Sequence, residues 1–264
     1  MELLRTYIQA WREAADDVDR VGAELSDADW ERPSECPGWR ARDVLAHLVD
    51  IEELLAADAE PDPSRDVALS EWTQVGVERH RDVPPTELLA ALRGAVERRA
   101  AYLAANPPDD PNDTAPRTPV DRGWSWDTLL RNRAIDMWVH GQDIRRAVDR
   151  PGGYDTAGAQ VTTMSFGLGL PYVIGKKVRP PAGTTVVWDI GGTHPAEHAV
   201  EMAASGRGVS LLEPPPEPSA RLGMDTETFV VLAAGRQPPE HVDVRVSGDA
   251  DLADRVLRAM ALTY

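Results

Sequence analysis

The 264-residue sequence is poor in cysteine, in positive charge and in long apolar runs. Because Cys36 is the single cysteine, an internal disulfide and a zinc site built from several cysteines are both excluded. The 28 Lys and Arg residues stand against 44 Asp and Glu residues, which gives a formal net charge of −16. Nucleic acids and anionic membranes require clustered basic residues, so we expect neither as a partner. No segment predicts a membrane span or a signal peptide, and we therefore expect a cytoplasmic protein.

Familiar motifs of nucleotide-binding proteins and hydrolases are also missing. The sequence has no Walker loop, no dinucleotide fingerprint and no nucleophile elbow. Cys36 lies in "SECPGW", just before a predicted helix whose positive dipole end favours a thiolate nucleophile. No histidine follows at a spacing that would activate it, so we interpret Cys36 as a small apolar residue at a turn.

The first 150 residues have the apolar periodicity of amphipathic helices. Leu4, Trp11, Val18 and Leu25 recur every seven residues in the first segment. Helices are predicted over about 2–25, 40–57, 65–80, 84–107 and 125–148, the last with Ser125 as its N-cap. This pattern predicts an up-and-down four-helix bundle, which we assign to residues 1–152.

The pattern changes after Gly152, where β-branched and alternating segments appear. Strands are predicted over 184–190, 198–203, 209–213, 220–225 and 242–248. Helices are predicted over about 156–173, 226–235 and 249–261, the second of them capped by Thr226. We therefore expect a linker with a short helix over 153–180 and a second, α+β domain over 181–264.

Three residues on two predicted helices form the candidate site. Asp136 and His140 are four residues apart, so their side chains lie one turn apart on the same helix face. If the helix that carries His47 packs alongside, two imidazoles and one carboxylate come together. That is the ligand set of a catalytic zinc site with one open position. Asp43, one turn before His47, is a plausible acceptor for the free ring nitrogen of His47.

Other interpretations of these residues are possible from the sequence. Arg133 lies three residues before Asp136, and an intrahelical ion pair on a solvated face would explain the carboxylate without a metal. In that case Asp143 would do no more than orient His140. Two histidines and a carboxylate also describe a non-haem iron(II) site. A metal-free binding or regulatory protein with a degenerate site is a third alternative.

The segments "CPGWRARDVLAHLVD", "RNRAIDMWVHGQDIRRAVDRPGG", "DTETFVVLAAGRQPP" and "VRVSGDADLADRVLRAM" resemble the mycothiol-dependent maleylpyruvate isomerase family. The resemblance implies an N-terminal DinB-like four-helix bundle and a C-terminal sterol-carrier-like α+β domain. It also implies zinc held by His47, Asp136 and His140. Members of that family usually carry Glu at the position of Asp136, so the carboxylate here is one methylene shorter.

The same resemblance implies an activity. Mycothiol would bind as a thiolate and attack an electrophilic carbon of a small substrate. Release of the thiol after bond rotation gives an isomerase, whereas retention of the thiol gives a transferase. The resemblance further implies a catalytic arginine in the second domain, for which Arg236 is the best match. Taken alone, Arg236 fits equally well a residue that complements the end of the preceding helix.

Overall fold

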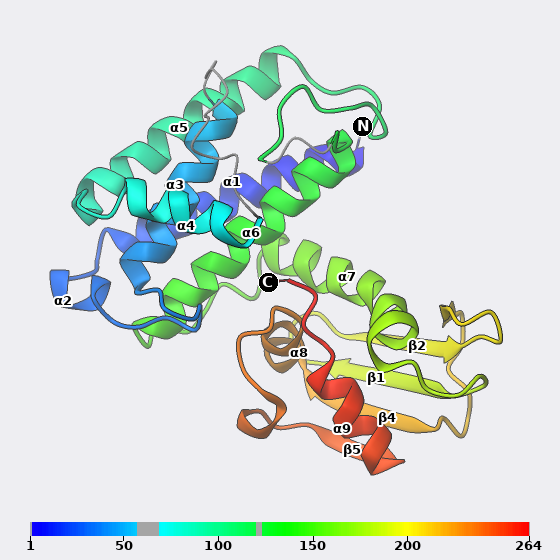
Figure 1. Cartoon of the computed structure of the whole chain (residues 1–264). Helices are drawn as coiled ribbons and strands as arrows, with labels where there is room; N and C mark the ends of the chain where they lie inside the picture. Colours follow the sequence, from blue (N-terminus) through cyan, green and yellow to red (C-terminus); the bar gives the residue numbers. More distant parts are fainter. Residues whose placement is uncertain (1, 57–68, 120–122, 264) are drawn as a thin grey trace. The chain divides into compact units, whose positions relative to one another are not determined.

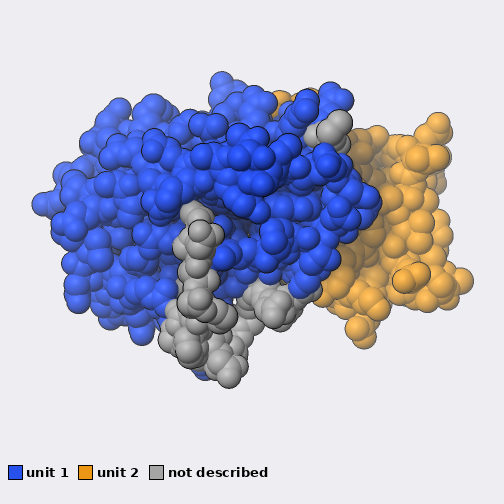
Figure 2. All heavy atoms as spheres, turned by 90° about the horizontal axis from the view of Figure 1, so that it is seen from above, with its two compact units in different colours: residues 1–161 blue, residues 162–264 orange. Residues whose placement is uncertain are grey.

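The structure is a computed structural model that describes residues 2–56, 69–119 and 123–263. The chain divides into two compact units, residues 1–161 and 162–264, hereafter unit 1 and unit 2 (Figure 2). The boundary between the units falls within one helix, Ala157–Tyr172 (α7). The domain limits at 152 and 181 that the sequence indicated remain a prediction.

Unit 1 is a bundle of four long helices (Figure 1). These helices are α1 (Glu2–Gly22), α3 (Ala41–Ala56), α5 (Pro85–Ala105) and α6 (Trp126–Ala147). The helix α1 packs against α5 and α6, and α3 packs against the same two helices, which closes a four-membered ring. Two shorter helices, α2 (Asp27–Trp30) and α4 (Leu69–Arg79), contact α3. The predicted bundle is therefore confirmed.

Local sequence explains where these helices begin. Ser125 is the N-cap of α6 as predicted, and its hydroxyl accepts a hydrogen bond from the Thr128 backbone nitrogen at 3.2 Å. Trp11, at the centre of the seven-residue repeat of α1, is 1% exposed. The helices predicted over 40–57 and 65–80 are found at 41–56 and 69–79, and residues 57 and 65–68 lie outside the described part of the chain.

Unit 2 is an α+β structure built on a five-stranded sheet, which confirms the predicted fold class. The strands are β1 (Thr185–Gly191), β2 (Ala196–Met202), β3 (Gly208–Leu211), β4 (Ala220–Asp225) and β5 (Arg245–Gly248). Their order is β3-β2-β1-β4-β5, and only the central β1–β4 pair is parallel. The strand β4 has the predicted limits.

Three helical segments of unit 2 pack against this sheet. They are η2 (Val173–Val178), a π-helix that the sequence did not predict, α8 (Thr226–Ala233) and α9 (Ala250–Arg258). The N-cap of α8 is Asp225, whose carboxylate accepts from the Thr228 nitrogen at 2.8 Å. The prediction that Thr226 caps this helix was wrong, because the Thr226 hydroxyl donates to the Gly191 carbonyl instead. A short η3 segment (Pro239–His241) precedes β5.

No helix within residues 2–56, 69–119 and 123–263 combines the length and the apolar character that a membrane span requires.

Candidate metal centre

The packing of α3 against α6 brings His47, Asp136 and His140 together. His47 Nε2 lies 3.6 Å from Asp136 Oδ2, and His140 Nε2 lies 3.6 Å from Asp136 Oδ1. The two imidazole rings are 4.8 Å apart between centroids. One ligand atom from each residue lies within 4.8 Å of the other two. The proximity expected from the sequence is therefore present, while metal binding by these residues remains a prediction.

The spacing of these atoms fits the ligand set of a small divalent cation. Zinc ligands at about 2.0–2.2 Å in tetrahedral geometry lie roughly 3.3–3.5 Å from one another. The two nitrogen–oxygen distances of 3.6 Å are close to that value, and they run to different oxygens of Asp136, His47 to Oδ2 and His140 to Oδ1. The side chains of His47 and His140 are 5% and 11% exposed, whereas that of Asp136 is 30% exposed. The carboxylate is thus the member of the cluster that solvent reaches most easily.

The protonation of the cluster follows from its charges. Burial alone would raise the pKa of Asp136, but the Arg133 guanidinium and His140 outweigh it and hold that pKa well below its usual value. Burial lowers the pKa of His47. Burial would also lower the pKa of His140, but the carboxylates of Asp136 and Asp143 outweigh this effect and raise it to about 10. A cation that binds His140 must therefore displace a proton.

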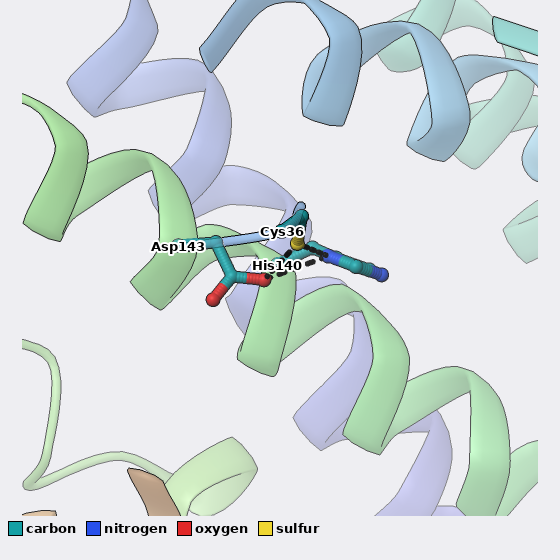
Figure 3. Close-up of side chains that lie close together, drawn as sticks. All are labelled: Cys36, His140 and Asp143. Atoms are coloured by element: carbon teal, nitrogen blue, oxygen red, sulfur yellow. Dashed lines mark hydrogen bonds and ion pairs between the residues drawn. The ribbon is translucent and has the colours of Figure 1, made fainter. Parts of the chain in front are cut away.

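The second ring nitrogen of His140 is held by a carboxylate on the same helix. His140 Nδ1 lies 2.9 Å from Asp143 Oδ2, so Asp143 orients the ring as the sequence suggested. The thiol of Cys36 donates to the same oxygen at 3.1 Å and lies 3.8 Å from His140 Nδ1 (Figure 3). Asp143 Oδ1 accepts from Arg146 at 2.8 Å. Cys36, His140 and Asp143 form a second group of possible ligands, which shares His140 with the first.

Cys36 is buried and lies at a turn, as predicted, but its interpretation as a purely apolar residue was wrong. Its side chain makes a polar contact with a residue 107 positions away in the sequence. The loop before α3 folds over α6 and places the thiol there, and no local spacing rule reveals such a contact.

The second ring nitrogen of His47 has a different environment. His47 Nδ1 is buried and has no hydrogen-bond partner among the described residues. The prediction that Asp43 accepts from this nitrogen was wrong. Asp43 instead accepts from the backbone nitrogen of Arg40 at 2.9 Å and from its guanidinium at 2.9 and 3.1 Å, at the beginning of α3. The ring of Trp39 lies 5.3 Å from the His47 ring.

Arg133 forms the ion pair with Asp136 that the sequence allowed, but on a buried face. Its Nη1 donates to Asp136 Oδ2 at 2.7 Å. Its Nε and Nη2 donate to Glu52 Oε1 at 3.0 and 2.6 Å. Glu52 is 0% exposed and also accepts from Arg99 at 3.0 Å and from the indole of Trp11 at 2.9 Å. The solvated face that a purely local pair predicts is therefore not observed.

The role of Glu52 was not predicted from the sequence. One signal was available, because Arg99 lies in register with the apolar residues Leu88, Leu92 and Ala95 of its helix. A charged residue in an apolar register requires a buried partner of opposite charge. The sequence did not say which acidic residue supplies it.

Arg236 lies in unit 2, directly after α8 and the left-handed residue Gly235. Its backbone nitrogen donates to the Val231 carbonyl at 2.9 Å, and its guanidinium donates to the Ala234 carbonyl at 2.8 Å. These contacts agree with the interpretation that Arg236 complements the end of the helix. Its catalytic role remains a prediction.

Comparison with known proteins links this chain to one family. Residues 11–145 match the family model described as the mycothiol maleylpyruvate isomerase N-terminal domain. The matched segment contains His47, Asp136 and His140, and Arg236 lies outside it.

Two solved structures share the fold over 94% of this chain and 94% of their own. One is a mycothiol-dependent maleylpyruvate isomerase, with 17% identity and a TM-score of 0.59. The other is a histidine-to-alanine mutant of a mycothiol-dependent maleylpyruvate isomerase, with 15% identity and a TM-score of 0.60. No curated protein matches the chain.

Proposed function

The chain belongs to the mycothiol maleylpyruvate isomerase family, and from this premise we propose that it is a metal-dependent enzyme acting on a low-molecular-weight thiol, mycothiol, and a small electrophile. The observation that carries the proposal is the cluster of two buried histidines, His47 and His140, with the partly exposed carboxylate of Asp136; their ligand atoms lie within 4.8 Å of one another. Two histidines and one carboxylate leave a coordination position open for a substrate in catalytic zinc sites.

The residues of the chain have separate roles in this proposal. His47, Asp136 and His140 would hold zinc, which when bound lowers the pKa of a coordinated thiol. Asp143 fixes the ring orientation of His140 through the 2.9 Å contact, and Arg133 fixes the carboxylate of Asp136 through the 2.7 Å contact. The ring of Trp39 lies 5.3 and 6.3 Å from the two imidazoles and limits their movement on that side.

The chemical outcome depends on the substrate. If the thiol adds to a cis double bond, rotation about the resulting single bond and elimination of the thiol give the trans isomer. If the thiol stays attached, the reaction is a thiol transfer. Both outcomes use the same thiolate nucleophile, so the cluster supports either one. Arg236 would orient an anionic group of the substrate or of the thiol.

One observation favours a rival, a metal-free binding protein. Arg133 already neutralises the Asp136 carboxylate at 2.7 Å, so the cluster does not need a cation to be electrically balanced. Elemental analysis of freshly purified protein separates the two functions. We expect one zinc per chain. Absence of bound metal together with no zinc uptake would favour the binding protein, and bound iron with oxygen consumption would favour a non-haem iron enzyme.

Two histidine variants test the site directly. In His140→Ala, zinc content and thiol-dependent turnover should be lost together, because one of the three ligands is removed. The matched control is His198→Ala in β2 of unit 2, which should keep both. Thiol transfer is read by mass spectrometry of mycothiol incubated with a panel of electrophiles, and isomerisation, which leaves the mass unchanged, is read by chromatographic separation of the cis and trans forms. Full activity in a metal-free His140→Ala protein would contradict the proposal.

Arg236→Ala tests the second domain. We expect it to retain one zinc per chain and to react more slowly, by about tenfold, the cost of one lost interaction of about 1.4 kcal/mol in the transition state. Unchanged turnover would remove Arg236 from the proposed mechanism and leave the metal site unaffected.

A further inference from the structure

Arg133 is fixed on two sides by carboxylate acceptors, the buried Glu52 and the partly exposed Asp136. It lies on α6, three residues before Asp136, and is 4% exposed. One edge of the guanidinium donates twice to Glu52 Oε1, at 3.0 and 2.6 Å. A third nitrogen, Nη1, donates to Asp136 Oδ2 at 2.7 Å. Because the guanidinium is planar and rigid, the contact with Glu52 determines where Nη1 points. Arg133 therefore cannot turn away from Asp136 without breaking its bonds to Glu52.

This arrangement makes the two oxygens of Asp136 unequal. Each oxygen faces one histidine at 3.6 Å, Oδ2 facing His47 Nε2 and Oδ1 facing His140 Nε2. Oδ2 in addition accepts the charge-assisted hydrogen bond from Arg133 at 2.7 Å, so Oδ1 is the oxygen that a cation can bind without competing with Arg133. Symmetric chelation of a cation by both oxygens would compete with that hydrogen bond. Coordination through one oxygen suits a four-coordinate cation such as zinc. Hard cations with six or more oxygen ligands gain more from a carboxylate that can offer both oxygens.

We propose that Arg133 sets the metal selectivity of the cluster by restricting Asp136 to coordination through one oxygen, and that Glu52 holds Arg133 in place for this purpose. The proposal rests on the proposed function in one respect, namely that the cluster binds a divalent cation. Arg133 is a positioning residue, because it contacts a ligand and not the cation.

The charge of Arg133 also repels a cation, and this effect must be separated from its geometric effect. Zinc and manganese(II) carry the same charge, so removal of the guanidinium strengthens the binding of both to a similar extent. Only the geometric effect differs between them, because manganese(II) prefers six ligands and zinc accepts four. The ratio of the two dissociation constants therefore isolates the restriction on Asp136.

Arg99 provides a matched control within the same ion network. It lies on α5, is 4% exposed like Arg133, and donates to Glu52 Oε2 at 3.0 Å. It contacts Glu52 and the Trp11 ring, and within the described part of the chain it forms no hydrogen bond or ion pair with Asp136. The variants Arg99→Met and Arg133→Met each remove one buried guanidinium from Glu52, but only Arg133→Met also releases Asp136.

The experiment measures zinc and manganese(II) dissociation constants for the full chain and for both variants. Chelator competition gives the zinc dissociation constant. The electron paramagnetic resonance signal of free manganese(II) gives the manganese(II) dissociation constant. We expect the manganese-to-zinc ratio to fall about tenfold in Arg133→Met, at the lower end of the effects known for residues that support metal ligands. In Arg99→Met it should stay within about twofold, because that variant leaves the support of Asp136 intact.

The outcomes are distinguishable. An unchanged ratio in Arg133→Met, or an equal change in Arg99→Met, would overturn the proposal while zinc binding by the wild-type chain upholds the proposed function. If the wild-type chain binds neither ion, the proposed function fails and this inference fails with it. Circular dichroism checks the fold of each variant. If Arg133→Met does not fold, the double variant Glu52→Gln/Arg133→Met, which removes one charge of each sign, takes its place. We expect the same tenfold fall in the manganese-to-zinc ratio of dissociation constants for it.

Discussion

Unit 1 and unit 2 bury different kinds of side chain. Within the described parts of the chain, the buried acidic, basic and histidine residues all belong to unit 1. They are Asp43, His47, Asp50, Glu52, Arg99, Arg133, His140, Asp143 and Arg145. The buried polar residues of unit 2 are threonines, and its largest buried side chains include Trp188 and Phe229. Burial of apolar area is therefore the main source of stability in unit 2.

The buried charges of unit 1 orient side chains at a cost in stability that the apolar core of unit 2 does not have. A buried ion pair seldom adds net stability, because removing two charges from water offsets their attraction. In unit 1, three of the buried charged residues support the candidate metal ligands: Glu52 holds Arg133, which holds Asp136, and Asp143 holds His140. The bundle thus orients the ligands in advance, whereas the core of unit 2 follows ordinary apolar packing.

The largest effect that we expect comes from removing the central charge of unit 1. In Glu52→Gln the shape is kept, but the buried guanidinium of Arg99 loses its anionic partner and that of Arg133 loses one of two, which should lower the free energy of unfolding of unit 1 by about 3–5 kcal/mol. Leu222→Ala in unit 2 is the matched change, since it removes volume and no charge and should cost about 2–5 kcal/mol. Hydrogen exchange followed by mass spectrometry measures the protection of the backbone amides of each unit separately. Equal protection of unit 1 in wild type and Glu52→Gln would contradict this view of the charged core.

The same comparison predicts how the two units respond to acid. Burial alone would raise the pKa of Glu52, but Arg133 and Arg99 outweigh it and hold that pKa below its ordinary value. The stabilisation is therefore complete above the unfolded pKa of about 4.3 and is lost as the pH falls through the lower, folded pKa. As the pH falls below about 4.3, unit 1 should lose protection before unit 2, and the difference between wild type and Glu52→Gln should shrink. A difference that stays constant down to pH 2 would exclude Glu52 as the titrating group.

A smaller effect should separate the two aspartates near the histidines. Asp143→Asn weakens the support of His140 and should reduce zinc affinity by about 10–100-fold. Asp43→Asn is the matched change on α3, and it should alter zinc affinity by less than about threefold, since Asp43 bonds to Arg40 and not to His47. Chelator competition measures both. A larger loss in Asp43→Asn would show that His47 depends on Asp43 after all.

The smallest effect should come from Cys36. Its thiol is a weak donor to an oxygen that already accepts from His140, so Cys36→Ser should change zinc affinity by less than about threefold and leave thiol-dependent turnover nearly unchanged. Abolished turnover with zinc still bound would instead make Cys36 a nucleophile, the role that its position before α3 first suggested.

Much of the architecture could be predicted from the sequence, because it depends on local periodicity. The seven-residue repeat of α1, the N-cap Ser125 and the alternation in β4 each reflect interactions within a few residues. The sequence did not distinguish between two neighbouring residues that could both act as the N-cap of one helix. Thr226 was predicted as the N-cap of α8, although the Asp225 carboxylate accepts the capping hydrogen bond.

For the candidate site, the sequence by itself determined that Asp136 and His140 share one helix face, because the period of a helix fixes residues four apart. Only the tertiary structure decided which atoms surround them. Glu52 meets Arg133 across 81 positions, and Cys36 meets Asp143 across 107. Such contacts depend on which helix faces pack together and on which side-chain rotamers the packing allows, and no local pattern encodes either.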